Sequence, residues 1–227
     1  MRHIKQGDNA TLVHCLNVGM LCFLFGLWLG WSKNDINMLV VAGVCHDIGK
    51  IRVPHEILYK PGKLTNEEFD EVKKHTVYGH QLLNKSDIPA EVRQTALMHH
   101  EKLDGGGYPF GKTNGAIDMY AAVVAICDVY EAMTSDRVYR AKVSPFEVIR
   151  KFEAGDFGAL RNDYIHIFTR KIADGFVNSR VLLSDDREGR IVAVQPHDLA
   201  NPLIYCDATQ DFIDLSRNKS ISILSVM

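Results

Sequence analysis

The sequence predicts a mainly α-helical protein: a helical bundle followed by a small antiparallel β appendage at the C-terminus. Three observations indicate this class. Helix-capping patterns recur along most of the chain, the stretch from Tyr120 to Met133 is apolar on nearly all sides, and short β-prone runs separated by turns follow Gly175. We therefore expect two domains, residues 1–175 and residues 176–227.

The first helical segment contains an uncharged run from Cys15 to Trp31. This run is marginal for a membrane span, which needs ~20 apolar residues, because Asn17 and three glycines interrupt it. No convincing small-residue cleavage site follows it, which disfavours a signal peptide. We interpret the run as a buried core helix and expect no membrane span. A helix that forms a homodimer would explain the apolar surface equally well, so the oligomeric state stays open.

Capping residues predict where later helices begin. Ser32 and the Thr65–Glu68 capping box precede helical patterns, Pro89 suits the first turn of another helix, and Ser144–Pro145 combines an N-cap with proline at the first helical position. Beyond the helices, alternating β-prone residues predict five short strands. These runs cover residues 181–184, 190–194, 203–206, 212–216 and 221–226.

Composition excludes several classes of function. The 227 residues are 46% hydrophobic and carry 26 basic against 28 acidic side chains, a formal net charge of -2. The chain therefore has enough apolar residues to form a globular core. It has no excess of basic residues with which to bind bulk nucleic acid. The five cysteines form no C-x-x-C pair, which indicates reduced thiols and a cytoplasmic protein.

A first cluster of chemically active residues is the segment His46-Asp47-Ile48-Gly49-Lys50. It follows a predicted apolar helix, and at a helix end both His46 and Asp47 can turn toward one point. An imidazole and a carboxylate together suit a divalent ion such as Mn, Fe, Ni or Zn. Taken alone, however, a His-Asp dipeptide is common and fits an ordinary loop.

A second cluster lies at another predicted helix end, where His99 and His100 precede glycines at positions 105–107. Consecutive glycines lower stability through backbone entropy unless the loop needs unusual dihedrals or a close approach to a ligand. Asp104 can hold this loop by accepting hydrogen bonds from backbone amides.

Two further features come from the apolar helix near residue 128 and the segment after it. Asp128 has apolar flanks, and burying its carboxylate is unfavourable unless it meets a cation. Arg137 and Arg140 follow the helix and offer guanidinium groups suited to phosphate oxygens.

In their order and spacing these motifs resemble the HD-GYP family, a branch of the HD-domain metal phosphohydrolases that hydrolyses the bacterial second messenger cyclic di-GMP. The resemblance extends from about Asp8 to Phe152. It rests on His14, His46-Asp47-x-Gly49-Lys50, His75, His99-His100-Glu101, Asp104-Gly105-x-Gly107-Tyr108-Pro109, Asp128 and Ser135-Asp136-Arg137.

The resemblance implies an HD-domain helical bundle and two divalent transition-metal ions, Mn, Fe or Ni, bridged by Asp47. Some members hold a third ion with a glutamate where this chain has Ala10, so we expect two. The assignment of His14 and His75 depends on the resemblance alone. The implied ligands are His14, His46, Asp47, His75, His99, His100 and Asp128.

The same resemblance implies a phosphodiesterase of bacterial signal transduction that hydrolyses cyclic di-GMP to linear pGpG, to GMP or to both. Asp47 and Lys50 would be catalytic, with Lys50 binding phosphate or assisting the leaving group. The implied substrate-binding residues are Lys50, Gly107, Tyr108, Pro109 and Arg137, although a structural salt bridge accounts for Arg137 equally well.

Members of the family also bind diguanylate cyclases through this surface, so a cyclase is an implied partner. Two alternatives differ in class: an HD phosphohydrolase that acts on another nucleotide, and a non-catalytic module that binds a cyclase or an adaptor. The seven retained ligand positions favour catalysis, because degenerate relatives usually lose ligands.

Overall fold

The structure is a computed structural model that describes residues 2–111, 117–135 and 143–227. The chain divides into two compact units, the first comprising Met1–Ala132 with Gly158–Arg161 and the second Met133–Phe157 with Asn162–Met227. The first unit is helical, and the second combines two helices with a sheet.

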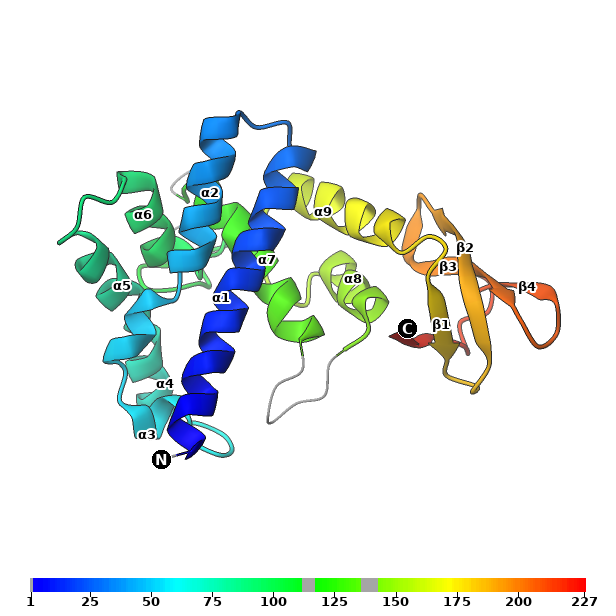
Figure 1. Cartoon of the computed structure of the whole chain (residues 1–227), viewed down its shortest axis with the longest axis horizontal. Coiled ribbons are helices and arrows are strands. Elements are labelled where there is room, and N and C mark those ends of the chain that lie inside the picture. The colour runs from blue at the N-terminus through cyan, green and yellow to red at the C-terminus, as the bar shows by residue number, and fades with distance from the viewer. Residues whose placement is uncertain (1, 112–116, 136–142) are drawn as a thin grey trace. The chain divides into compact units, whose positions relative to one another are not determined.

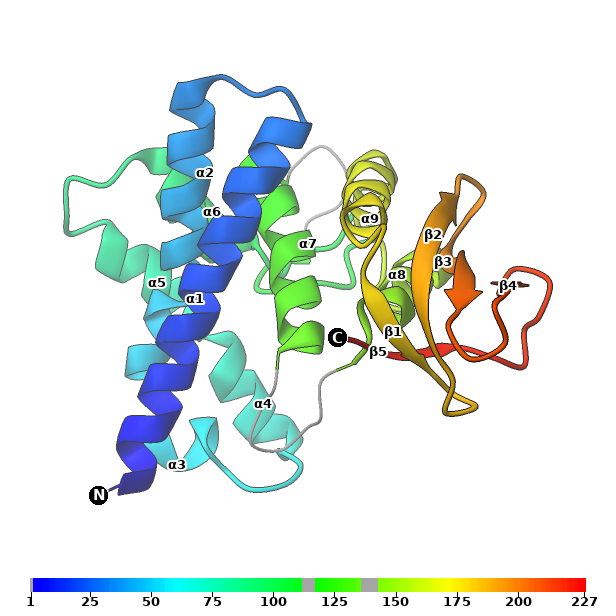
Figure 2. The ribbon, with the colours of Figure 1, turned by 45° about the vertical axis from the view of Figure 1, so that its right-hand side comes forward.

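The first unit is built from packed helices, and Figure 1 shows α1 beside α2, with α5 and α6 on the α2 side. In Figure 2, α7 lies alongside α1. The elements are α1 (Arg2–Trp28), α2 (Lys33–Cys45), the 3₁₀ helix η1 (Ile48–Arg52), α3 (His55–Leu58), α4 (Asn66–Lys73), α5 (His75–Leu83), α6 (Ala90–Met98) and α7 (Met119–Thr134).

The predicted caps account for several helix starts. Ser32 accepts a hydrogen bond from the Asp35 amide at the start of α2. At α4 the box is complete, because the Thr65 hydroxyl accepts from the Glu68 amide and the Glu68 carboxylate accepts from the Thr65 amide. Pro89 precedes α6 as its N-cap residue. The Ser32 and Thr65 side chains satisfy amides that have no partner within the helix, whereas Pro89 makes no such hydrogen bond.

Helices α1 and α2 pack closely through glycines. A Cβ added at Gly43 would lie 2.9 Å from the Cys22 sulfur and 3.2 Å from the Gly19 Cα, so the two helices approach more tightly than side chains would permit. The interpretation of α1 as a buried core helix holds for only one of its faces, because Met20 is 62% exposed and Leu27 is 52% exposed.

Among the described residues, one helical segment, Asn9–Trp28, is long and apolar enough to cross a membrane by length and composition alone. A core helix or a signal sequence passes the same test. The absence of a membrane span therefore stays a prediction.

The second unit contains α8 (Pro145–Ala154), α9 (Asn162–Gly175) and an antiparallel sheet, and Figure 2 shows the two helices next to the strands. Its strand order is β4-β3-β2-β1-β5, and the central strand β2 pairs with β1 and β3. The strands are β1 (Arg180–Leu183), β2 (Glu188–Gln195), β3 (Asp198–Cys206), β4 (Asp211–Asp214) and β5 (Ile223–Val226).

A continuous apolar core joins the helices and the sheet of this unit. Phe146 and Ile149 of α8 and Ala173 of α9 are buried in one cluster with strand residues such as Val181 and Ile204. The predicted fold class, mainly helical with a C-terminal antiparallel sheet, is confirmed. The division at residue 175 stays a prediction, to which the structure adds that α8 and α9 share their core with the strands.

Candidate metal centre

The end of α2 directs two adjacent side chains into the interior of the helical unit. His46 is the C-cap of α2 and Asp47 follows it; both are buried, and His46 Nε2 lies 3.3 Å from Asp47 Oδ2. Gly49 then allows η1 to pass against α5, because a Cβ at that position would lie only 1.9 Å from the His75 carbonyl oxygen. The glycine thus permits the approach that brings His75 to Asp47.

The other predicted ligands reach the same point from four helices. His75 is the first residue of α5, and its Nε2 lies 3.3 Å from Asp47 Oδ1. His99, the C-cap of α6, approaches the same oxygen at 3.9 Å. From the other side, His14 Nε2 on α1 lies 3.0 Å from Asp128 Oδ1 on α7 and 3.8 Å from Asp47 Oδ2.

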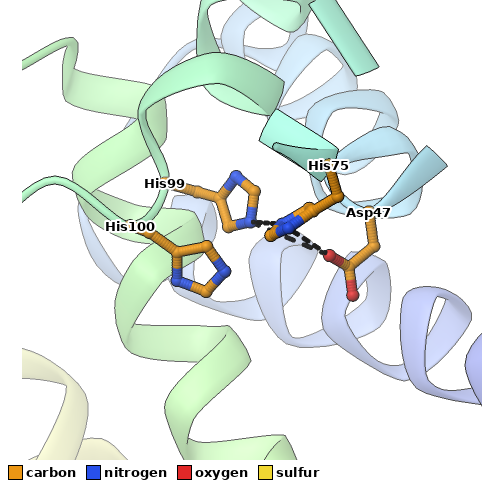
Figure 3. Close-up of side chains that lie close together, drawn as sticks. All are labelled: Asp47, His75, His99 and His100. Carbon is orange, nitrogen blue, oxygen red and sulfur yellow. Dashed lines mark hydrogen bonds and ion pairs between the residues drawn. The ribbon is translucent and has the colours of Figure 1, made fainter. Parts of the chain in front are cut away.

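These side chains form two groups able to hold a metal ion, and both groups contain Asp47. One consists of Asp47, His75, His99 and His100, and the other of His14, His46 and Asp47; within each, the potential ligand atoms lie within 4.8 Å of one another. Figure 3 shows the first group, with the imidazoles of His75 and His99 and the Asp47 carboxylate directed toward one another. Asp128 adds a carboxylate beside the second group, 3.8 Å from His46 Nε2.

Backbone carbonyls orient three of the imidazoles. His46 Nδ1 donates to the Gly43 carbonyl at 2.7 Å, and His75 Nδ1 donates to the Val72 carbonyl at 2.7 Å. His99 Nδ1 lies 3.2 Å from the carbonyl oxygens of Thr95 and Ala96. A carbonyl can only accept, so Nδ1 carries a proton in each ring and Nε2 faces the centre, as in metal-ligating histidines.

Glu131 orients the fourth histidine, and the sequence reasoning missed it. Its Oε2 contacts His14 Nδ1, while its Oε1 accepts a hydrogen bond of 3.0 Å from the Asn17 amide. Glu131 is 4% exposed and lies three residues after Asp128, on the same face of α7. That i, i+3 pair of carboxylates on an apolar helix was the available signal.

The carboxylates at the centre are ionised. Burial alone would raise the pKa of Asp47, but the charges of Lys50 and His46 hold that pKa well below its usual range. Burial acts the same way on Asp128, whose pKa is nevertheless lowered by its hydrogen bond with His14 and by the nearby His46. Two ionised carboxylates in a buried site need compensating positive charge.

The histidines divide into two kinds by their surroundings. Burial lowers the pKa of His99 well below its usual range, and it lowers the pKa of His100 to about 3, so both are neutral. Burial also opposes the charging of His14, yet hydrogen bonds to Asp128 and Glu131 raise its pKa to about 9. A neutral imidazole is the form that binds metal, so His99 and His100 are already in that form. The carboxylates of Asp128 and Glu131 favour a positive charge at His14.

The donor set fits divalent cations. Among the residues that the structure describes, the buried His46 Nε2 and Asp47 Oδ1 have no hydrogen-bond partner, an unfavourable state for polar atoms shielded from water. Both atoms face the cluster, where a cation would satisfy them. Imidazole nitrogens combined with carboxylate oxygens suit first-row transition metals.

Lys50 and the glycine loop lie at the edge of this centre. The Lys50 amine contacts Asp47 Oδ2, and although burial would lower its pKa, Asp47 and Asp128 raise it, so the amine stays charged. The Tyr108 ring packs against His100, with ring centroids 4.6 Å apart. A Cβ at Gly107 would lie 2.4 Å from the His100 carbonyl oxygen, so the loop presses directly on the histidine segment.

The expectation for Asp104 is confirmed, because its Oδ1 accepts a hydrogen bond of 2.8 Å from the Gly106 amide. The buried Glu101 carboxylate braces the same loop by accepting from the Phe110 amide at 2.8 Å. Arg137, predicted to contact phosphate, lies outside the described residues. The structure brings together the seven predicted ligands.

Comparison with known proteins agrees with this geometry. A family profile described as HD domain matches residues 8–156. The chain is 34% identical over 202 residues to the cyclic di-GMP phosphodiesterase PA4108 of Pseudomonas aeruginosa, covering 88% of this chain and 49% of that protein. It is 38% identical over 146 residues to 3'3'-cGAMP-specific phosphodiesterase 1 of Vibrio cholerae, covering 64% of this chain and 34% of that protein.

Among solved structures, Bd1817, an HDG"Y"P protein of Bdellovibrio bacteriovorus, superimposes with a TM-score of 0.60 at 19% identity, covering 71% of this chain and 52% of that one. At that identity the likeness concerns the fold. The chain spans about half the length of its Pseudomonas relative and about a third of its Vibrio relative.

Proposed function

The chain belongs to the HD-domain family, in its HD-GYP branch, and we propose that it is a metal-dependent phosphodiesterase that hydrolyses cyclic di-GMP. One observation carries the proposal most of all: the buried Asp47 carboxylate belongs to two neighbouring groups of potential metal ligands. A carboxylate shared between two ions would hold them close together, which suits the two-metal hydrolysis of phosphate esters.

In this proposal the two ions are divided between the two sides of Asp47. His75, His99 and His100 would hold one ion, and His14, His46 and Asp128 the other, with Asp47 binding both. Mn, Fe and Ni all accept such mixed imidazole and carboxylate ligands, so availability decides among them. When bound, the ions supply Lewis acidity toward phosphate oxygens and lower the pKa of water.

The surrounding residues would bind and orient the substrate. Lys50 keeps its charge beside Asp47, where it can bind a phosphate oxygen or donate a proton to the leaving 3′ oxygen. Gly107, Tyr108 and Pro109 form a wall beside His100, and Tyr108 offers a ring to a guanine base. Arg137 would supply a further phosphate contact by virtue of its position in the family motif.

The names of relatives support a cyclic dinucleotide as the substrate class. PA4108 is named for cyclic di-GMP and the Vibrio relative for 3'3'-cGAMP. These two cyclic dinucleotides differ in one purine base. The ion centre would treat both phosphodiesters alike, so base-facing residues such as Tyr108 would decide between them. The product would be pGpG, GMP or both. The protein partner would be a diguanylate cyclase, and the enzyme would act in the cytoplasm.

A direct assay tests the proposal. Protein loaded with Mn or Fe is incubated with cyclic di-GMP or 3'3'-cGAMP, and the products are resolved by chromatography. We expect hydrolysis of cyclic di-GMP to pGpG or GMP, with a higher kcat/KM than for 3'3'-cGAMP. Faster hydrolysis of 3'3'-cGAMP would reassign the substrate. No hydrolysis by protein that carries two ions, together with tight binding to a cyclase, would favour the interaction module instead.

A further inference from the structure

Helix α1 has an apolar face that the helical unit buries. Cys15, Val18, Cys22 and Phe25 follow one another at alternating spacings of three and four residues, and none is more than 7% exposed. This is the spacing of a helix that packs along its length against other helices. This buried face is the part of α1 that packs against the rest of the helical unit.

A second apolar stripe on α1 has no such cover among the described residues. Val13, Leu16, Met20, Phe23 and Leu27, here named the outer seam, repeat the same alternating spacing and are each between 46% and 62% exposed. A single exposed leucine is unremarkable, but five large apolar residues in register form a continuous surface. Such a pattern is typical of the contact seam between two packed helices.

A groove runs beside the outer seam and widens the apolar surface. It has a volume of about 730 Å³ and is lined on one side by Leu16, Met20 and Leu24 of α1 and on the other by Val40 and Val44 of α2. Neighbouring Leu12 and Val41 are 57% and 41% exposed. A helix laid along the outer seam could therefore insert side chains into this groove, as knobs enter holes in a coiled coil.

The chemistry of this surface argues for one kind of partner. From Asn9 to Trp28 the helix contains no lysine, arginine, aspartate or glutamate, so a charged partner segment would find nothing to pair with. A matching partner is an uncharged helix with apolar residues at the same alternating spacing. Helix α1 itself meets that description, and a two-fold axis would set each outer seam against its equivalent.

The exposed area is of the size that a stable dimer needs. The outer seam and its flanking residues comprise eight large apolar residues, each 41% to 62% exposed. At about 150–200 Å² per large apolar residue, taken from the lower end of the range for aromatic side chains, they present roughly 600–800 Å² per copy. A standard interface buries about 800 Å² per partner, whereas apolar patches on monomers are usually about 300–600 Å².

We propose that the outer seam of α1, with the adjoining α1–α2 groove, is a homodimer interface occupied by the same surface of a second copy of this chain. Met20 lies midway along the seam, between Val13 and Leu27, and would stand next to the two-fold axis. None of the residues used here belongs to the metal centre, so the inference is independent of the proposed enzymatic activity.

The mass of the full chain in solution tests this interface. Light scattering coupled to size-exclusion chromatography should give a dimer for the wild type. Met20→Glu should raise the dimer dissociation constant by about 100-fold or more, because two carboxylates would then face each other in an apolar contact. Phe212→Glu is the matched control, since Phe212 is also 62% exposed but lies on β4; this variant should remain dimeric.

A second variant keeps the test decisive if the glutamate disturbs folding. Met20→Cys should form an intermolecular disulfide under mild oxidation, because its two copies would approach within bonding range, whereas Phe212→Cys should not. A wild-type chain that stays monomeric at all concentrations up to about 100 µM, well above typical dissociation constants of dimers, would overturn the proposal. So would a Met20→Glu protein that remains fully dimeric.

A lipid surface is the competing occupant, and the same variants distinguish it. Uncharged phosphatidylcholine vesicles should not retain the wild-type chain in a flotation assay. Retention of monomeric wild type on such vesicles, abolished by Met20→Glu and unaffected by Phe212→Glu, would assign the outer seam to a membrane and overturn the dimer.

Discussion

Charged residues are buried at the candidate metal centre but exposed in the C-terminal sheet. At the centre, Asp47 is 2% exposed and lies among His46, His75 and His99, none of which is more than 1% exposed. In the sheet, Arg180 pairs with Glu188 and Asp207, but all three side chains are between 45% and 53% exposed. The core beneath that sheet is built from apolar residues such as Val181, Ile191 and Ile204.

This difference in burial distinguishes residues that serve a functional site from residues that stabilise the fold. Removing a carboxylate from water is unfavourable by several kcal/mol unless a cation compensates it. A fold that needed only stability would place apolar side chains there, as the sheet does. Buried charges with unsatisfied atoms therefore indicate a site, whereas exposed ion pairs change stability by only about 0–1 kcal/mol.

Removal of the shared carboxylate should produce the largest change. Protein purified without chelator should contain close to two transition-metal ions per chain, and Asp47→Ala should lose both, because each ligand group includes this residue. His46→Ala should reduce the metal content less completely. Inductively coupled plasma mass spectrometry measures the content directly. The control, Asp207→Ala in the turn after β3, should retain both ions, and an Asp47→Ala protein that does likewise would contradict the shared-ligand assignment.

Lys50→Ala should preserve the metal content but lower kcat by ~10²–10⁴, the usual contribution of a positioned proton donor. The reason is that the Lys50 amine contacts Asp47 without being a metal ligand. Steady-state kinetics of cyclic di-GMP hydrolysis gives this value, and Lys74→Ala on the exposed pair with Glu71 is the control. Tyr108→Ala should instead mainly raise KM. Unchanged turnover in Lys50→Ala would exclude the lysine from the reaction.

Two glycines test how tightly the centre is built. Gly49→Ala places a Cβ 1.9 Å from the His75 carbonyl oxygen, so we expect a loss of about 3 kcal/mol in the free energy of unfolding. Gly175→Ala, at the end of α9 with no atom within 4 Å of the added Cβ, should gain up to about 1 kcal/mol. Urea denaturation followed by circular dichroism measures both. Equal stability of the two variants would show that η1 can move away from α5.

Glu131→Ala should weaken metal affinity by about 10–100-fold, since groups that orient ligating histidines typically contribute that much. Here the group lost is the one that contacts His14 Nδ1 and accepts from Asn17. Competition with a metal-binding dye measures the affinity. Glu131→Gln should recover part of it by keeping a hydrogen-bonding side chain, and an unaltered affinity in Glu131→Ala would make the contact with His14 incidental.

The smallest effect is expected in the sheet. Arg180→Ala removes two exposed ion pairs and should change the free energy of unfolding by no more than about 0.5 kcal/mol, because water and salt screen them. Metal content and turnover should not change. A loss of several kcal/mol in thermal or urea unfolding would mean that exposed charge matters as much here as buried charge does at the centre.

Sequence patterns predicted the parts of the fold that depend on local interactions. Capping at Ser32 and Thr65, the apolar α7 and the period-two strands all act through neighbouring residues, so they can be recognised along the chain. Strand bounds were less accurate: β3 begins at Asp198, five residues before the predicted run, because pairing with β2 extends it. Pairing depends on tertiary structure and leaves little local signal.

The candidate site shows the same limit. His46, Asp47, His99 and His100 could be identified from motif chemistry, whereas His14 required the family resemblance, because a single histidine on a helix has many explanations. Glu131 was missed although its spacing from Asp128 was visible. The two faces of α1 could not be separated either, since both are apolar and only packing decides which of them is covered.

Because backbone carbonyls hold His46, His75 and His99, these side chains lose conformational entropy when the protein folds and not when an ion binds. Free imidazoles would have to give up ring rotation and a choice of tautomer when an ion arrives, but Gly43, Val72 and Thr95 restrict both in advance. The centre is therefore a preorganised receptor, unlike small zinc domains whose ligands gather only when the ion binds. With the ligands already in place, an ion can leave and another can bind without the helices having to reform.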